Sequence, residues 1–167
     1  MIRVRPLGAS EWPAFKDFRL MALESAPGMF ATSYDEASAR SPEAWQETIA
    51  GPNHQVFGLF DAAQLIGITG VFGGRDESSD DAAFLVMSFI LPEYRRRGLS
   101  LMLYQACLDW IRVRRKFKRA VVAIRASNEA SQRACRRLGF TCIGRKPRTW
   151  PDGITEDELI YELRLTD

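Results

Sequence analysis

The chain has 167 residues, of which 46% are hydrophobic and 26% charged, and its formal net charge is only +2. This length suits one domain with a single core, and the small charge argues against a strongly acidic or basic partner. The N-terminus lacks the apolar run of a signal peptide, and no apolar stretch approaches the roughly 18 residues that a membrane span needs. Three cysteines without a CxxC pair, with a single histidine, indicate neither a disulfide framework nor a zinc site, so we expect a reduced, cytoplasmic protein.

The first half of the chain predicts a mixture of strands and helices. In chain order these are a strand at 2–6, a helix from the cap residue Ser10 to about residue 25, a loop after Pro27-Gly28, a helix from Ser41-Pro42 to about residue 50, a hairpin of strands 55–61 and 64–73, and a polar loop at 74–81. Serine is expected at both helix starts because its side chain accepts a hydrogen bond from the first turn, where proline also fits.

The second half alternates strands and helices more regularly. In chain order these are a strand at 82–91, which Pro92 ends, a helix over 98–114, a strand at 120–124, a helix from its cap Asn128 to Leu138-Gly139, and strands at 140–144 and 160–165 joined by the turn-rich residues 147–153. Residues 82–91 are apolar without interruption, as in a central strand covered on both faces. One stripe carries the apolar side chains of the first of these helices: Leu99, Met102, Leu103, Ala106, Trp110 and Val113. The whole order predicts one α/β domain, residues 1–167, around a mixed sheet.

The small net charge conceals an uneven distribution along the chain. Residues 1–94 hold 6 Lys and Arg against 13 Asp and Glu, a balance of −7. Residues 95–148 hold 16 against 2, a balance of +14, and residues 149–167 hold 1 against 6, a balance of −5. A basic centre between acidic flanks indicates that an anion binds to the central part of the chain.

A phosphate-binding turn is predicted between the strand at 82–91 and the helix that follows it, at Arg95-Arg96-Arg97-Gly98-Leu99-Ser100. The first turn of a helix has backbone N–H groups without intrahelical partners and a partial positive charge, both of which suit a phosphate. Gly98 lets the backbone come close to the phosphate oxygens, and the arginines add charge. The alternative is a solvated run of arginines at the start of a surface helix.

Two motifs at this spacing resemble the GNAT family of acetyl-CoA-dependent N-acetyltransferases. Arg95 to Ser100 is similar to the family signature Gln/Arg-x-x-Gly-x-Gly/Ala, with serine at the last position. Asn128 to Phe140 is similar to the family pattern of an Asn cap, an Ala-rich helix and a Gly-Phe end, and the close match covers residues 84–140. The resemblance implies a mixed, largely antiparallel central sheet, flanked by helices, with splayed central strands.

The resemblance also implies which residues bind acetyl-CoA, the acyl donor, without a metal. The residues that would contact it are Phe89, Ile90, Arg95, Arg96, Arg97, Gly98, Leu99, Ser100 and Asn128. Backbone amides of the turn would hold the pyrophosphate, and the backbone of Ser88 to Ile90 would pair with the pantetheine arm. The Ser88 backbone would also polarise the thioester carbonyl, as in an oxyanion hole. Asn128 would contact the pantetheine and cap its helix at the same time.

The family's usual catalytic acid and base are both absent from this chain. Many members carry a tyrosine seven residues after the Asn as proton donor to the leaving thiolate, and here that residue is Cys135. Some carry a glutamate base five residues before the Asn, and here that residue is Ala123. Cys135 is either a proton donor or a small buried apolar residue, and we expect the latter. The base candidates are Asp35, Glu36 and His54.

The resemblance implies an N-acetyltransferase in which an amine attacks the thioester directly in a ternary complex. A thiol with a pKa of roughly 8.5 leaves without a strong acid, so missing the usual tyrosine does not exclude catalysis. The alternative is a catalytically degenerate GNAT-like domain that binds acyl-CoA as a sensor or scaffold.

The expected partners follow from charge and from the family. The acidic residues 1–94 favour a cationic amine as acceptor, and the family admits a homodimer. We expect no membrane and no nucleic acid as partner, because the Arg-rich runs 112–119 and 133–148 lack stacking aromatic residues beyond Phe117.

Overall fold

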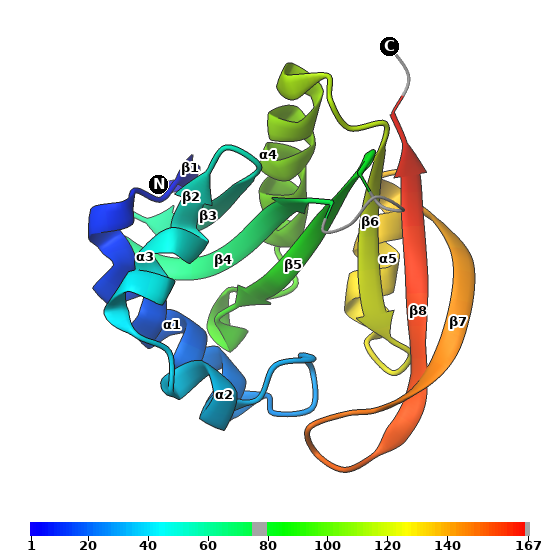
Figure 1. Ribbon diagram of the computed structural model, residues 1–167, viewed down its shortest axis with the longest axis horizontal. Coiled ribbons are helices and arrows are strands. Elements are labelled where there is room, and N and C mark those ends of the chain that lie inside the picture. Colours follow the sequence, from blue (N-terminus) through cyan, green and yellow to red (C-terminus); the bar gives the residue numbers. More distant parts are fainter. Residues whose placement is uncertain (75–79, 166–167) are drawn as a thin grey trace.

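The computed structural model describes residues 1–74 and 80–165, so most of the predicted polar loop at 74–81 lies outside the described residues. The strands are β1 (Ile2–Pro6), β2 (Ala50–Gly51), β3 (His54–Asp61), β4 (Gln64–Gly73), β5 (Ala82–Ile90), β6 (Arg119–Arg125), β7 (Thr141–Thr149) and β8 (Thr155–Arg164). They form an eight-stranded sheet in the order β1-β3-β4-β5-β6-β8-β7, with β2 added beside β3 (Figure 1). Neighbouring strands are antiparallel except β5 and β6, which confirms the predicted mixed, largely antiparallel sheet.

Helices cover both faces of this sheet. They are α1 (Trp12–Ser25), α2 (Tyr34–Ser38), α3 (Pro42–Ile49), α4 (Leu99–Arg114) and α5 (Glu129–Arg137). Figure 1 shows α1, α2 and α3 over one face of the half that holds β3 to β5, with α4 and α5 behind the sheet. Two buried clusters result, one between α4, α5 and the sheet and one between α1, α3 and the sheet. Among the described residues no helix is long and apolar enough to cross a membrane.

The start of the first helix differs from the prediction, which placed its cap at Ser10. Ala9–Glu11 forms a short 3-10 helix, and the regular helix begins at Trp12 with a proline as its second residue. The Glu11 carboxylate accepts a hydrogen bond from the Gly8 N–H at 2.8 Å and also pairs with Arg5. The carboxylate therefore satisfies the free backbone donor that a serine cap would otherwise serve.

The other caps agree with the prediction, and one short helix was not predicted. Ser41 and Asn128 each accept a hydrogen bond, at 3.2 Å, from the backbone N–H three residues later. The predicted loop after Pro27-Gly28 contains α2, which Ser33 caps by accepting from the Glu36 N–H at 3.1 Å. A helix of five residues is too short to show apolar periodicity, so only its cap could have indicated it.

The buried face of α4 is wider than the predicted stripe. Met102 and Val113 are 38% and 79% exposed, whereas four side chains outside the stripe are buried: Tyr104, Cys107, Leu108 and Ile111. The helix packs against both the sheet and the core below α5, so a broader band of residues faces the interior. Of these side chains, Tyr104 becomes important for the chemistry discussed below.

The central strands separate soon after they meet. β5 and β6 form parallel pairs only at Ala82, Ala83 and Phe84, and Figure 1 shows the two strands diverging beyond this point. The prediction of a strand covered on both faces therefore holds only for its first residues, and Val86, Met87 and Ser88 are half-buried. Met87 has a φ of +62°, and the pairing with β4 shifts register here, so β5 carries a bulge before its open end.

The last two strands are longer than predicted. β7 and β8 extend through most of the residues expected to form turns, and only 150–154 connect them. Pro147 lies inside β7, which is tolerated because β7 is the edge strand of the sheet. The long hairpin curves around the same end of the molecule at which β5 and β6 separate (Figure 1).

Candidate active site

The basic turn after β5 has a conformation that exposes its backbone amides. Pro92–Tyr94 forms one 3-10 turn, and the chain then passes through Arg96 with a φ of +63° and Gly98 with a φ of +73°. Gly98 is the N-cap of the 16-residue helix α4 and provides no side-chain cap. A Cβ atom at Gly98 would meet nothing within 4 Å, so the glycine is needed for its backbone angle and not for packing.

The positive charge of this turn is not neutralised by the described part of the chain. Arg95, Arg96 and Arg97 are exposed, and none of them forms a salt bridge with a described residue. The Arg95 Nε donates to the Ile90 carbonyl at 2.9 Å, and Tyr94 anchors the turn by donating to an Asp61 carboxylate oxygen at 2.7 Å. Free amides and unpaired arginines at a helix N-terminus form an anion-binding site.

The open end of β5 leads directly into this turn. Ser88 and Ile90 are half-buried at the edge from which β6 has diverged, and the Ser88 hydroxyl lies 2.8 Å from that of Thr69 on β4. The Phe89 side chain is buried on the other face, against Phe18 and Phe30 with ring centroids 6.0 and 6.2 Å away. An unpaired strand edge can accept an extended, amide-containing ligand.

Asn128 lies on the other side of the opening, where β6 passes into α5. Its carboxamide oxygen is engaged by the Ser131 N–H, so the predicted capping role is confirmed, while the amide nitrogen has no partner among the described residues. The structure thus brings together the predicted residues of β5, the basic turn and the start of α5. They surround one opening in the sheet.

The residues at the family's acid and base positions differ sharply in environment. Cys135 is fully buried on α5, and burial raises the pKa of its thiol to about 12. Ala123 is exposed on β6, opposite Ile160 of β8. A thiol with so high a pKa is not ionised near neutral pH and lies inside the apolar core.

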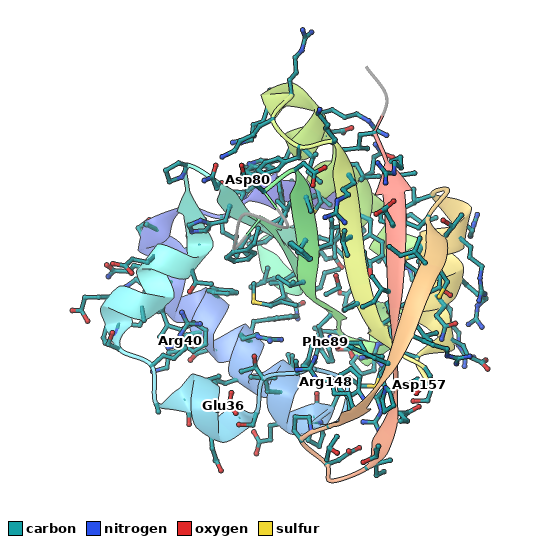
Figure 2. All side chains as sticks on the ribbon, turned by 45° about the vertical axis from the view of Figure 1, so that its right-hand side comes forward. Glu36, Arg40, Asp80, Phe89, Arg148 and Asp157 are labelled. Atoms are coloured by element: carbon teal, nitrogen blue, oxygen red, sulfur yellow. The ribbon has the colours of Figure 1, made fainter. Side chains whose placement is uncertain are left out.

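The three base candidates lie at two ends of the molecule. Asp35 and Glu36 are exposed on α2, and Figure 2 places Glu36 at the same end as Phe89. His54 begins β3, where its ring stacks on Phe72 at 5.0 Å and its Nε2 lies 2.5 Å from the Glu47 carbonyl. Phe72 pairs with Phe84, the end of β5 farther from the basic turn, so the structure does not bring His54 to the opening.

Sequence analysis missed a buried arginine that fixes the chain around the opening. Arg125, at the end of β6 and 6% exposed, bonds to the Gly28 carbonyl, to Glu156 and to Asp152, the last at 2.8 Å. The pKa of Asp152 is lowered by the Ile154 N–H and by Arg125, and the pKa of Glu156 is lowered by Arg125 and Ser127. These partners join the α1–α2 connection to the β7–β8 hairpin.

A second buried arginine has no such partners. Arg19 on α1 is 6% exposed, and its Nη1 atom makes no hydrogen bond. Its guanidinium lies over the Phe30 ring at 4.6 Å, and burial, with repulsion from Arg40, lowers its pKa to about 10. Within the ranges that the structure describes, no three His, Cys, Asp or Glu side chains gather as metal ligands would.

Three solved structures are similar to the chain over nearly its whole length. A GNAT-family acetyltransferase from Streptococcus pneumoniae is 14% identical, with a TM-score of 0.85 over 99% of this chain and 100% of that one. The yncA protein of Salmonella typhimurium, solved with its cofactor acetyl-CoA, is 18% identical, with a TM-score of 0.81 over 100% and 95% of the two chains. A ribosomal-protein-alanine N-acetyltransferase from Brucella melitensis is 20% identical, with a TM-score of 0.82 over 98% and 99%. At these identities the likeness shows a common fold.

Sequence comparison identifies the family. No curated protein matches the chain at a significant level, but a model of the acetyltransferase (GNAT) family matches residues 17–140. This range is well over half of the chain and contains the open end of β5, the basic turn and α5. The chain therefore belongs to the GNAT family of acetyltransferases.

Proposed function

We propose that this protein binds acetyl-CoA in the opening between β5 and β6 and transfers the acetyl group to an amine. The observation that carries the proposal is the continuity of three features: the unpaired edge of β5, the exposed amides of the turn at 95–98 and the unneutralised arginines. Coenzyme A has the same three parts in order, namely a reactive thioester, an amide-containing arm and a phosphorylated nucleotide. Acetyl-CoA supplies an activated acyl group to such a site.

The residues of the turn fit the phosphates. We propose that the amides of Arg96 to Ser100 bind the pyrophosphate, because a helix N-terminus combines free N–H groups with a positive field. Arg95, Arg96 and Arg97 add long-range attraction, and the small Ser100 leaves room beside the helix axis. The similar structure from Salmonella typhimurium holds acetyl-CoA, and another similar structure, RimL, is a complex with coenzyme A, which supports the assignment.

The open strand and α5 fit the rest of the molecule. We propose that the backbone of Ser88, Phe89 and Ile90 pairs with the pantetheine arm, and that Asn128 contacts it from the opposite side. The Ser88 backbone is placed to polarise the thioester carbonyl, which stabilises the charge that develops when the amine attacks. Binding both reactants in one opening supplies the remaining acceleration by proximity.

The amine attacks the carbonyl directly, and the carbon–sulfur electron pair leaves with the thiolate. Cys135 takes no part in this scheme, because its thiol is buried and has a raised pKa. Of the base candidates we retain Asp35 and Glu36, since α2 and the chain before it lie at the wide end of the opening (Figure 1). One of these carboxylates would take the proton that the amine loses.

We further propose a cationic amine as acceptor. The four carboxylates of the β7–β8 hairpin are already paired with arginine or lysine, namely Asp152, Glu156, Asp157 and Glu158. Asp35 and Glu36 form no salt bridge with a described residue, so their negative charge is available at this end of the molecule. A carboxylate pair of this kind attracts a protonated amine.

The experiment is acetyl-CoA-dependent thiol release measured over a panel of amines, with acetyl-CoA affinity measured separately. Transferase activity predicts thiol release that depends on both the protein and one class of amine, with one amide formed for each thiol. The second candidate, an acyl-CoA sensor, is favoured by the absence of the family's tyrosine and glutamate. It predicts tight binding without thiol release.

A further inference from the structure

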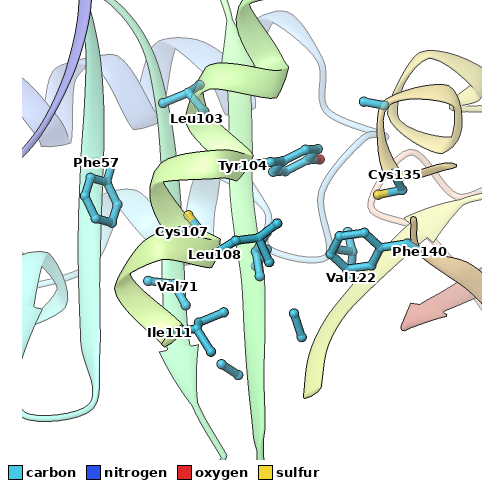
Figure 3. Close-up of a cluster of buried hydrophobic side chains, with 14 of the residues drawn as sticks. Phe57, Val71, Leu103, Tyr104, Cys107, Leu108, Ile111, Val122, Cys135 and Phe140 are labelled. Carbon is cyan, nitrogen blue, oxygen red and sulfur yellow. The ribbon is translucent and has the colours of Figure 1, made fainter. Parts of the chain in front are cut away.

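The buried phenol of Tyr104 points toward the place where the family's proton donor is missing. Tyr104 lies on α4, is 3% exposed and belongs to the same buried cluster as Cys135. Figure 3 shows its hydroxyl directed across the core toward Cys135. Burial raises the pKa of this phenol well above its ordinary value, and nearby Cys135 raises it further, so the group keeps its proton.

The Tyr104 hydroxyl is part of a row of hydroxyl groups beneath the opening. Hydrogen bonding with Ser88 on β5 and with Ser131 on α5 partly offsets the rise in its pKa. Ser88 in turn lies 2.8 Å from the hydroxyl of Thr69, which is fully buried on β4. The row therefore reaches from one side of the opening to the other, below the strand residues that we assign to the pantetheine arm.

The surroundings of this row are otherwise apolar. The neighbouring side chains of the cluster are aliphatic or aromatic, including Leu103, Leu108, Ile111, Val122 and Phe140 (Figure 3). A phenylalanine at position 104 would fill the same volume without placing a polar group in the core. Packing accounts for the ring of Tyr104 but not for its hydroxyl group.

We propose that Tyr104 donates a hydrogen bond to the sulfur of the leaving thiolate, in place of the tyrosine that many family members carry at position 135. This inference rests on the proposed function. As the nitrogen–carbon bond forms and the carbon–sulfur bond breaks, the electron pair moves to sulfur, where the Tyr104 O–H faces it. The amine's proton passes to the base or to water, and the thiolate is reprotonated by water on release, so Tyr104 keeps its own proton throughout.

The direct test is Tyr104→Phe, which removes one oxygen atom and keeps the ring. A hydrogen bond to a charged group is worth about 1.5–3 kcal/mol, so kcat is expected to fall by roughly 10-fold to 150-fold. The KM for acetyl-CoA and the unfolding temperature should stay near their wild-type values. Val113→Ala, at an exposed position of the same helix, is the matched control and should leave kcat unchanged. A Tyr104→Phe protein with wild-type kcat would overturn the proposal while leaving the transferase function intact.

A second measurement tests the same contact without turnover. In the complex with coenzyme A, the thiol can be titrated by the ultraviolet absorbance of its thiolate. The donor predicts a pKa of the bound thiol that is about 1–2 units lower in the wild-type protein than in Tyr104→Phe. Equal values in the two proteins would contradict it. This readout does not depend on the acceptor, so it remains decisive if the wild-type protein binds acetyl-CoA and releases no thiol, the result that overturns the proposed function.

Discussion

Phe84 of β5 lies opposite Val121 of β6, and beyond these two residues the strands form no further pair in the described part of the chain. The consequence is an open strand edge in the middle of a sheet, which a protein normally avoids because unpaired backbone groups are costly. Here the edge ends at the basic turn that begins α4. The cost of the opening is understandable if a ligand with its own amide groups completes the pairing.

The turn assignment predicts a specific effect at Gly98. Replacing it by glutamate places a carboxylate beside the free amides, so acetyl-CoA affinity is expected to fall at least about 100-fold. Gly153→Glu is the matched control, because Gly153 also has a positive φ, +82°, with nothing within 4 Å of a Cβ atom. Both variants carry the same charge and comparable backbone strain. Calorimetric titration with acetyl-CoA decides, and an unchanged affinity in Gly98→Glu would rule out the turn as the phosphate site.

The burial of Cys135 predicts that its thiol is dispensable for the chemistry. Cys135→Ala is expected to keep kcat within about threefold of wild type while lowering stability by about 1 kcal/mol, since it removes a small buried apolar group. Steady-state kinetics and urea unfolding measure the two effects. A loss of more than about 100-fold in kcat, with acetyl-CoA affinity unchanged, would instead identify Cys135 as the proton donor.

The ion cluster around Arg125 predicts a pH-dependent contribution to stability. The pKa values of Asp152 and Glu156 are lowered in the folded protein, so their contribution is present above the unfolded pKa values, near pH 4, and is lost as the pH falls through the folded values. Arg125→Met should lower the unfolding temperature by about 5 °C at pH 7, and the difference from wild type should shrink below about pH 4.

Thermal unfolding of both proteins over this pH range measures the effect. Arg133→Met is the control, because Arg133 forms only an exposed pair with Glu129, 3.8 Å away. A constant difference between wild type and Arg125→Met at all pH values would show that the lost stability is packing and not charge.

The unpartnered guanidinium of Arg19 predicts a stabilising substitution. Burial without a carboxylate lowers its pKa to about 10, so the charged form is penalised at neutral pH. Arg19→Met keeps the length of the side chain and should raise the free energy of unfolding by about 1–2 kcal/mol after loss of the contact with Phe30. Urea unfolding at pH 7 checks this, and a destabilised variant would mean that the arginine has a favourable partner in solution.

The parts of the site that depend on neighbouring residues could be predicted from the sequence. The basic turn, its glycine and the cap at Asn128 are local patterns, each set by the chemistry of a helix terminus. The order of strands and helices also led to the correct fold, because strand and helix periodicities differ. The opening itself entered only through the family resemblance.

The parts that depend on distant residues could not. Arg125 bonds to Gly28 and Asp152, 97 and 27 positions away, and no local pattern marks such a contact. Tyr104 falls outside the apolar stripe of its helix, so its burial depends on how α4 packs against the sheet and α5. The length of the β7–β8 hairpin was underestimated because Pro147 is typical of turns, whereas an edge strand also accepts it.

Thiol release over the amine panel tests the central claim most directly. The wild-type protein is expected to release coenzyme A from acetyl-CoA only when an amine of one class is present, most strongly for a cationic amine, and to form one amide for each thiol. Gly98→Glu should abolish the reaction, and Gly153→Glu should not. Tight acetyl-CoA binding without thiol release for any amine in the panel would contradict the account and identify the protein as an acyl-CoA-binding domain without turnover.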